Sequence, residues 1–435
     1  MSYHKIGLLD HMGYGNLGDA AIQESVISNI RKRLPNTVFV GFSSNPDDTR
    51  RRHNIDSFPL SWSYQGSDKE NVLDTSARYL VARLKKVIKK CRAVHALAKP
   101  FHDLLHETVH LLRSYCIVRS LDLLIISGGG QLCELWGGPW AAPYNVFKFC
   151  LLARLSRTPV IILNVGVSPL KYRLSRFFAK WAVRLSDYAS FRDRESQVLL
   201  ASLGVKSRTH VFPDLAYGLV LPEVKSEEHS GRGKLVVGLN PKGFCDPRLW
   251  PRKDFSVYSR YLDKLTSFSS WLLSRGFALR IFTNDPSTDG YAIEDLQERL
   301  RAAGRHEKEL IVATVPARTV SELIRQLMSF DFVVTSKFHG VVFSHMVAKP
   351  VIALSYQPKM DNLMRAVGHE RYCMDIEHFD VGWLKETFDL LVENSDNLKV
   401  LFRETAERYA AVLQTQFDEL FATGGNLCRS AFRPR

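Results

Sequence analysis

The sequence predicts two Rossmann-like α/β domains that face each other across a cleft and are closed by C-terminal helices. Short apolar runs alternate with helical segments in both halves of the chain, and a polar segment at 220–234 separates the halves. The runs are continuously apolar, which is typical of parallel strands buried on both faces. The 435 residues also exceed what one hydrophobic core usually holds and suffice for two.

We predict the first domain over residues 1–220 and the second over 235–384, with residues 385–435 as closing helices. The first domain opens with a strand, a glycine-bearing turn, a helix over 20–34 and a second strand, the opening order of a doubly wound fold. The expected strands lie at 5–10, 37–42, 121–127, 159–167, 188–191, 209–214, 234–240, 278–285, 309–315, 331–336 and 350–356. In such a pair of domains the active site lies in the cleft, at the carboxyl ends of the strands.

Residues 75–118 depart from this alternation, because they are helical, basic, rich in histidine and far longer than a typical connection. We interpret them as an inserted helical hairpin with Pro100 near its break. Four lysines recur at helical spacing beside a modest apolar face, a pattern typical of a helix lying on an anionic membrane and equally of a solvated helix packed on its own domain. These lysines are Lys85, Lys86, Lys89 and Lys90.

The composition narrows the function classes. A formal charge of +14 indicates an anionic partner, but no basic motif with interleaved aromatics and no helix-turn-helix pattern points to nucleic acid. No apolar run reaches the length that spans a bilayer, so we expect a cytoplasmic protein, with the hairpin as a peripheral contact at the inner membrane face. The seven cysteines show no CxxC or zinc-site spacing, so we expect neither disulfides nor a metal.

Two glycine-rich turns follow predicted strands. GYGNLGDAA (13–21) leads into a helix expected to start near Asp19, whose free N–H groups could bind an anion beside Asn16. Asp19 is equally a plain helix N-cap. The second turn, Gly128, Gly129 and Gly130, leaves a bare backbone rim suited to a ligand, or is simply a sharp turn between a strand and a helix.

Basic residues follow two further strands. Arg192 stands at the tip of a strand, where its guanidinium could bind a carboxylate or phosphate or only pair with a neighbouring acid. Ser336, Lys337 and His339 crowd the turn after another strand, a combination that suits a phosphorylated ligand and proton transfer. Lys359 follows the next strand and could reach the same cleft. A lone histidine after a strand is also often structural.

These motifs together resemble the polysaccharide pyruvyl transferase family. The matching segments, in the family's order, are GNLGDAAI (15–22), DLLIISGGGQL (122–132), NVGVSPL (164–170), FRDRES (191–196), FPDLAYGL (212–219) and SKFHGVVFSHMVAKPVIALSYQPK (336–359). The resemblance spans most of residues 5–370 and omits the basic hairpin. Two departures stand out, because the family usually has arginine where this chain has Lys337, and its GxGIGP segment is NVGVSP here.

The resemblance implies a GT-B-like fold and an enzyme that moves pyruvate from phosphoenolpyruvate onto a sugar of a polysaccharide or of its lipid-linked precursor, forming a ketal. It implies that Arg192 and Lys337 hold the donor's carboxylate and phosphate, with His339 beside them. The ketal chemistry also needs an acid and a base, for which we expect His339 and Asp19, and it requires no cofactor.

The alternative is a GT-B glycosyltransferase that uses a nucleotide sugar, in which His339 and Lys337 would hold a diphosphate. An acidic residue late in the second domain that binds the ribose of the nucleotide would favour that alternative. Glu322 is not obviously placed for this contact.

Overall fold

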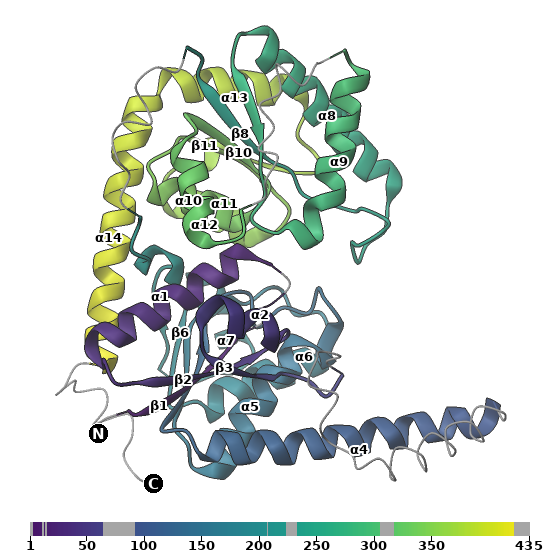
Figure 1. The fold of residues 1–435 in the computed structure, drawn as a ribbon, viewed down its shortest axis with the longest axis vertical. Coiled ribbons are helices and arrows are strands. Elements are labelled where there is room, and N and C mark those ends of the chain that lie inside the picture. Colours follow the sequence, from purple (N-terminus) through teal and green to yellow (C-terminus); the bar gives the residue numbers. More distant parts are fainter. Residues whose placement is uncertain are drawn as a thin grey trace.

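A computed structural model describes residues 3–10, 13, 15–63, 92–206, 208–222, 233–304 and 317–421, with residues 92–101 as backbone only. The chain folds into two parallel sheets surrounded by helices, one sheet in each half (Figure 1). The predicted α/β class is therefore confirmed. The strands at 123–127, 160–165, 236–240 and 351–355 are buried along their whole length, as the uninterrupted apolar runs predicted.

The first sheet has seven strands in the order β3-β2-β1-β4-β5-β6-β7. Its strands are β1 (Lys5–Leu9), β2 (Val38–Ser43), β3 (Asp56–Pro59), β4 (Leu123–Ser127), β5 (Val160–Val165), β6 (Tyr188–Phe191) and β7 (His210–Val211). Its helices are α1 (Leu17–Arg33), α2 (Pro46–His53), α4 (Arg92–Arg119), α5 (Ala142–Ser156), α6 (Arg173–Leu185) and α7 (Arg194–Ser202), with short 3-10 helices η2 (Gly138–Trp140) and η3 (Leu215–Gly218).

The second sheet has five strands in the order β12-β11-β10-β8-β9. Its strands are β8 (Val236–Asn240), β9 (Ala278–Ile281), β10 (Phe332–Thr335), β11 (Val351–Ser355) and β12 (Cys373–Asp375). The helices that follow its strands are α8 (Phe255–Ser274), α9 (Pro286–Ala302), α10 (Val320–Met328), α11 (Phe338–Met346), α12 (Pro358–Ala366) and α13 (Val381–Glu393). The strand orders place β1 and β4 in the middle of the first sheet, and β8 and β10 in the middle of the second sheet. The loops that follow these four strands therefore face the junction of the halves.

The last helix, α14 (Ser395–Phe421), ties the halves together. It runs along both of them (Figure 1) and packs against α1, η3 and α11. Gln416 of α14 accepts a hydrogen bond from the Asn164 amide over 2.9 Å, and Asp418 pairs with Arg33 over 2.7 Å. One buried apolar cluster accordingly continues through both halves, and a second covers the other face of the first sheet.

Several details differ from the sequence-based expectations. Strands β3 and β12 were not predicted, because runs of four and three residues carry little pattern. The strand expected at 309–315 lies outside the described residues. Helix α1 begins earlier than expected, at Leu17, because Asn16 occupies its N-cap position.

The basic insertion is only partly described. Its second part is the continuous helix α4, which runs through Pro100. The interpretation of Pro100 as a helix break is therefore wrong: the flanking segments are rich in alanine and leucine, which sustain a helix around one lost backbone hydrogen bond. The four lysines at 85–90 lie outside the described residues. Within the described part of the chain, no helix combines the length and apolar character required to cross a membrane.

Candidate active site

A cavity of about 450 Å³ opens between the two halves, at the carboxyl ends of strands from both sheets. Seven of the predicted site residues line it: Asn16, Asp19, Gly130, Arg192, Lys337, His339 and Lys359. The fold therefore brings together side chains that lie up to 343 positions apart in the sequence. A ligand in this cavity would contact both halves.

The other three predicted residues do not line this cavity and instead shape its turns. Gly128 has a φ of +51°, and a Cβ there would lie 2.6 Å from the Ile22 side chain. Gly129 has a φ of +61°, and its carbonyl accepts the Gly166 N–H over 2.8 Å. The buried Ser336 hydroxyl hydrogen-bonds the hydroxyl of Tyr261 at 2.9 Å.

Arg192 follows β6, and its side chain is only 4% exposed. Its guanidinium lies over the Phe338 ring, 4.5 Å from the centroid, and 3.5 Å from an Asp214 oxygen. Gly166 makes this position possible, because a Cβ there would lie 2.4 Å from the guanidinium carbon. Among the described residues, the Arg192 Nε–H has no hydrogen-bond partner, although it lies 3.7 Å from Asp193. The cavity wall therefore contains a fixed cation with one unsatisfied donor.

His339 lies in the first turn of α11 and touches the other half of the protein. A Cβ on Gly18 of α1 would lie 2.1 Å from the ring nitrogen Nδ1, so only glycine allows this contact. The other nitrogen, Nε2, lies 3.9 Å from Asp214 and has no hydrogen-bond partner in the described part of the chain. Burial lowers the pKa of His339 to about 4, against the opposing effect of Asp214, so the ring is neutral near pH 7.

Asp19 lies in the first turn of α1, where the Asn16 amide donates a hydrogen bond to its carboxylate over 2.7 Å. Burial raises the pKa of Asp19 to about 6, although the Lys359 charge opposes that shift. Asn16, and not Asp19, is the N-cap: its side chain accepts the Gly18 N–H. The Leu17 N–H donates to the carbonyl of Asn284 from the other half over 2.7 Å. We expected this helix end to offer free N–H groups to an anion. That expectation is wrong for the N–H groups of Gly18 and Leu17, because both already donate hydrogen bonds within the protein.

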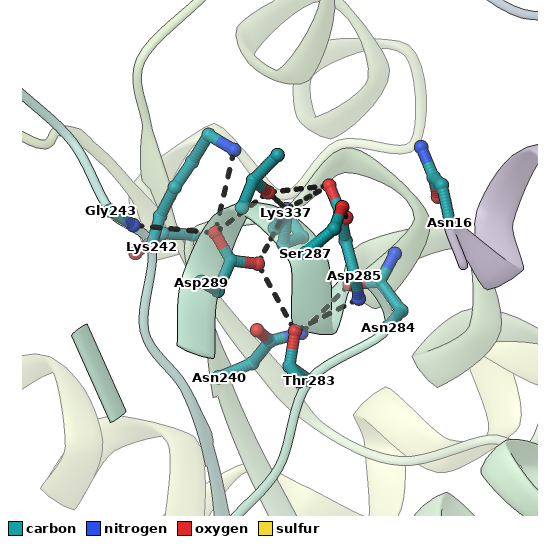
Figure 2. A network of polar contacts seen from close by, with 12 residues as sticks. Asn16, Asn240, Lys242, Gly243, Thr283, Asn284, Asp285, Ser287, Asp289 and Lys337 are labelled. Carbon is teal, nitrogen blue, oxygen red and sulfur yellow. Dashed lines mark hydrogen bonds and ion pairs between the residues drawn. The ribbon is translucent and has the colours of Figure 1, made fainter. Parts of the chain in front are cut away.

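Lys337 is the centre of a buried ionic network (Figure 2). Its ammonium lies 3.0 Å from Asp285 and 2.5 Å from Asp289, both contributed by the segment after β9. Burial by itself lowers the pKa of Lys337, but the two carboxylates outweigh it and hold the pKa above its ordinary value. Lys337 therefore already has two anionic partners. Any anionic ligand would have to share Lys337 with these two carboxylates.

Lys242 is a second buried lysine, which the sequence analysis missed. It follows β8, lines the cavity and lies 3.8 Å from Asp289 (Figure 2). Its ammonium is 4.9 Å from the ring centroids of both Trp250 and Tyr356. Burial and the neighbouring Lys337 charge lower the pKa of Lys242 to about 7. Its place just after a predicted strand, like that of Lys337, was the signal that could have identified it.

The sequence analysis missed two further features of the cavity. Asp10, at the end of β1, accepts hydrogen bonds from the amides of Gln23 and Gln131 and lines the cavity. Trp136 lines the cavity with 48% of its surface exposed, and its ring meets that of Trp250 edge-on at 5.4 Å. Among the described residues, no group of three or more His, Cys, Asp and Glu side chains is placed to hold a metal ion.

Two Rossmann-like halves with a polar cavity between them define the GT-B-like class of fold. Solved structures of this class match nearly the whole chain. The UDP-GlcNAc 2-epimerase of Methanocaldococcus jannaschii has a TM-score of 0.56 at 9% identity, over 94% of this chain and 99% of that one. The MnaA–UDP co-structure from S. aureus has a TM-score of 0.54 at 11% identity, over 98% and 94%. The spinosyn rhamnosyltransferase SpnG, complexed with thymidine diphosphate, has a TM-score of 0.50 at 10% identity, over 95% and 99%.

Within this class the particular family follows from the sequence. The polysaccharide pyruvyl transferase model matches residues 16–358, which include every site residue discussed except Asp10 and Lys359. The chain belongs to the polysaccharide pyruvyl transferase family, as its motifs indicated. None of the curated proteins matches the chain.

Proposed function

We propose that this protein transfers pyruvate from phosphoenolpyruvate to two hydroxyls of a sugar, in a polysaccharide or its lipid-linked precursor, and forms a ketal. The observation that carries the proposal is the convergence of Arg192, Lys242 and Lys359 on one cavity. Beside them lies Nε2 of His339, to which none of the described residues hydrogen-bonds. Phosphoenolpyruvate carries a carboxylate and a phosphate, and charge-assisted hydrogen bonds from such cations are the strong ones.

The reaction needs a proton at C3 of the donor, which makes C2 electrophilic. The two sugar hydroxyls then add at C2 and lose their protons, while the bond between C2 and the phosphate oxygen breaks and inorganic phosphate leaves. Asp19 has a pKa of about 6 and is therefore ionised at neutral pH. Because this pKa is close to neutral pH, the carboxylate can accept a proton and return it. Burial keeps His339 neutral near pH 7, and a bound anion beside it would raise its pKa and allow it to carry the proton.

The proposed acceptor surface is aromatic. Trp136, Trp250 and Tyr356 form a wall in which successive rings meet edge-on, with centroids 5.4 and 5.5 Å apart. Sugar rings present apolar C–H faces that pack on aromatic side chains, while their hydroxyls remain free to react. Trp136 is the exposed end of this wall, so we assign it to the acceptor.

A glycosyltransferase that uses a nucleotide sugar is the competing function. The residue considered for a ribose contact, Glu322, is engaged elsewhere, because it accepts the Arg318 N–H over 2.8 Å and closes a capping box with Thr319.

Thermal-shift measurements separate the two functions, since a ligand that binds only the native state raises the melting temperature. Phosphoenolpyruvate is expected to stabilise the protein, and Arg192→Ala to weaken its binding by about 1.5–3 kcal/mol. Stabilisation by UDP- or GDP-sugars without any by phosphoenolpyruvate would contradict the proposal and favour the glycosyltransferase.

A further inference from the structure

One continuous stretch of the chain carries much of the excess positive charge. From residue 135 to residue 186 it has eight lysines and arginines and no aspartate or glutamate. Lys148 is buried and pairs with Glu107 at 3.3 Å. Within the described part of the chain, the other seven form no ion pair. They are Arg154, Arg157, Lys171, Arg173, Arg176, Lys180 and Arg184.

Helix α6 displays these charges together with aromatic rings. Its inner face is buried in the first half through Phe178, Ala182 and Val183. Its outer face follows the helical spacing i, i+3, i+4, i+7, i+8, i+11, which places these side chains side by side. The outer face consists of Arg173, Arg176, Phe177, Lys180, Trp181 and Arg184. Phe177 is 47% exposed and Trp181 39% exposed.

The neighbouring elements add further exposed aromatic and basic residues, since α5 packs beside α6 (Figure 1). Phe147 of α5 contacts Phe177 at 5.9 Å between ring centroids, and Trp140 of η2 contacts Phe178 at 5.6 Å. We call this surface the aromatic–basic face. It comprises the seven basic residues above and the exposed apolar residues Trp140, Leu151, Leu155, Tyr172, Phe177 and Trp181.

We propose that the aromatic–basic face docks onto a lipid bilayer that contains anionic headgroups. A helix that lies on a membrane combines basic residues, attracted to the anionic surface, with tryptophan, phenylalanine and leucine side chains that enter the boundary with the acyl chains. The mixture found here, two aromatic rings among four bases on one side of α6 with no acid, fits that requirement. It is a basic motif with interleaved aromatics, which the sequence analysis overlooked. It is distinct from the four lysines at 85–90.

Short stretches of chain connect the aromatic–basic face to the cavity. Trp140 comes four residues after Trp136, and α6 begins five residues after Ser168; both Trp136 and Ser168 line the cavity. Docking would therefore hold the cavity close to the membrane surface. An acceptor sugar attached to a membrane lipid could then reach the site, a consequence that rests on the proposed function.

Vesicle sedimentation tests the docking without any substrate. The purified full-length protein is mixed with vesicles of phosphatidylcholine alone or of phosphatidylcholine with phosphatidylglycerol, at low and at high salt. The charge variant carries Arg173→Gln, Arg176→Gln, Lys180→Gln and Arg184→Gln, and the ring variant carries Phe177→Ser and Trp181→Ser. A matched control removes four other bases by Lys253→Gln, Arg260→Gln, Arg301→Gln and Arg403→Gln, all exposed in the second half or on α14.

The wild type and the control are expected to sediment with the anionic vesicles only, and less so as salt screens the charges. Each basic residue near such a surface contributes roughly fivefold to binding, so the charge variant should bind at least about 100-fold more weakly. The ring variant should also bind more weakly. The charge variant should keep the wild-type melting curve, and the ring variant should melt at a somewhat lower temperature because it loses the contact of Phe177 with Phe147. Both variants should keep full turnover on a soluble acceptor fragment.

Three results would overturn the docking proposal. The wild type could remain in the supernatant at low salt, or the control could lose as much binding as the charge variant, which would indicate net charge alone. Self-association that the ring variant abolishes, without vesicle binding, would assign the face to a second copy of the chain. If the protein binds the vesicles as expected but neither the wild type nor any variant consumes phosphoenolpyruvate, the proposed function is wrong. The docking proposal is then still supported.

Discussion

Replacement of Lys337 by methionine is expected to destabilise the protein through the two carboxylates that it leaves behind. The ammonium lies 3.0 Å from Asp285 and 2.5 Å from Asp289, and its side chain is only 7% exposed. Removing one partner of a buried ion pair typically costs about 3–5 kcal/mol, because the remaining charge is uncompensated. We expect the lower end of that range, since Lys242 is 3.8 Å from Asp289 and its pKa would rise once the Lys337 charge is gone.

The pH dependence of this loss follows from the pKa shifts. Lys242 and Lys337 hold the pKa of Asp285 below its ordinary value in the folded protein, against the effect of burial. Its contribution to stability is therefore present above the unfolded pKa of about 3.9 and is lost as the pH falls through the folded value. The pKa of Lys337 is raised, so its contribution is fully present below about pH 10 and is lost only in stronger alkali. The difference between wild type and variant should accordingly shrink in acid. It should grow above about pH 7, where Lys242 loses its proton in the folded wild type but keeps it in the variant.

Urea denaturation followed by circular dichroism measures this difference. The double variant with Asp289→Asn should recover part of the stability that methionine alone loses, because it removes one of the two stranded charges. A loss below about 1 kcal/mol in the single variant, with no recovery in the double variant, would refute the buried ion-pair reasoning. Lys337 would then be available to a ligand, as the family resemblance implied.

Three further predictions concern catalysis. The value of kcat/KM should rise as the pH increases through about 6, where Asp19 ionises, and fall above about 7, where Lys242 loses its proton. A pH profile without these two limbs would exclude Asp19 as the base and Lys242 as a donor-binding cation. His339→Gln should lower turnover by about 10²–10⁴-fold with little change in melting temperature, whereas a matching loss of stability would indicate a structural histidine. Gly18→Ala should lower turnover by about 10²-fold, because the new methyl group would lie 2.1 Å from the His339 ring. Gly290→Ala is the control, since its new methyl group would have no described atom within 4 Å.

The sequence determined the fold class and much of the cavity. Continuous apolar runs are a local signal of buried parallel strands, and the residues just after a run must lie at the carboxyl edge of the sheet. Arg192, His339 and Lys359 could be placed on that basis alone, and the structure brings all three to one cavity. Short strands such as β3 and β12 escaped prediction because their neighbours in the sheet, and not their own residues, stabilise them.

Only the tertiary structure decided what state those residues are in. The two carboxylates that surround Lys337 come from a segment about fifty positions earlier, and Lys242 from nearly a hundred positions earlier. The raised pKa of Asp19 and the lowered pKa of His339 arise chiefly from burial where the halves meet. Charge and desolvation act through space at a few ångströms, and the sequence orders residues only along the chain, so neither effect could be read from it.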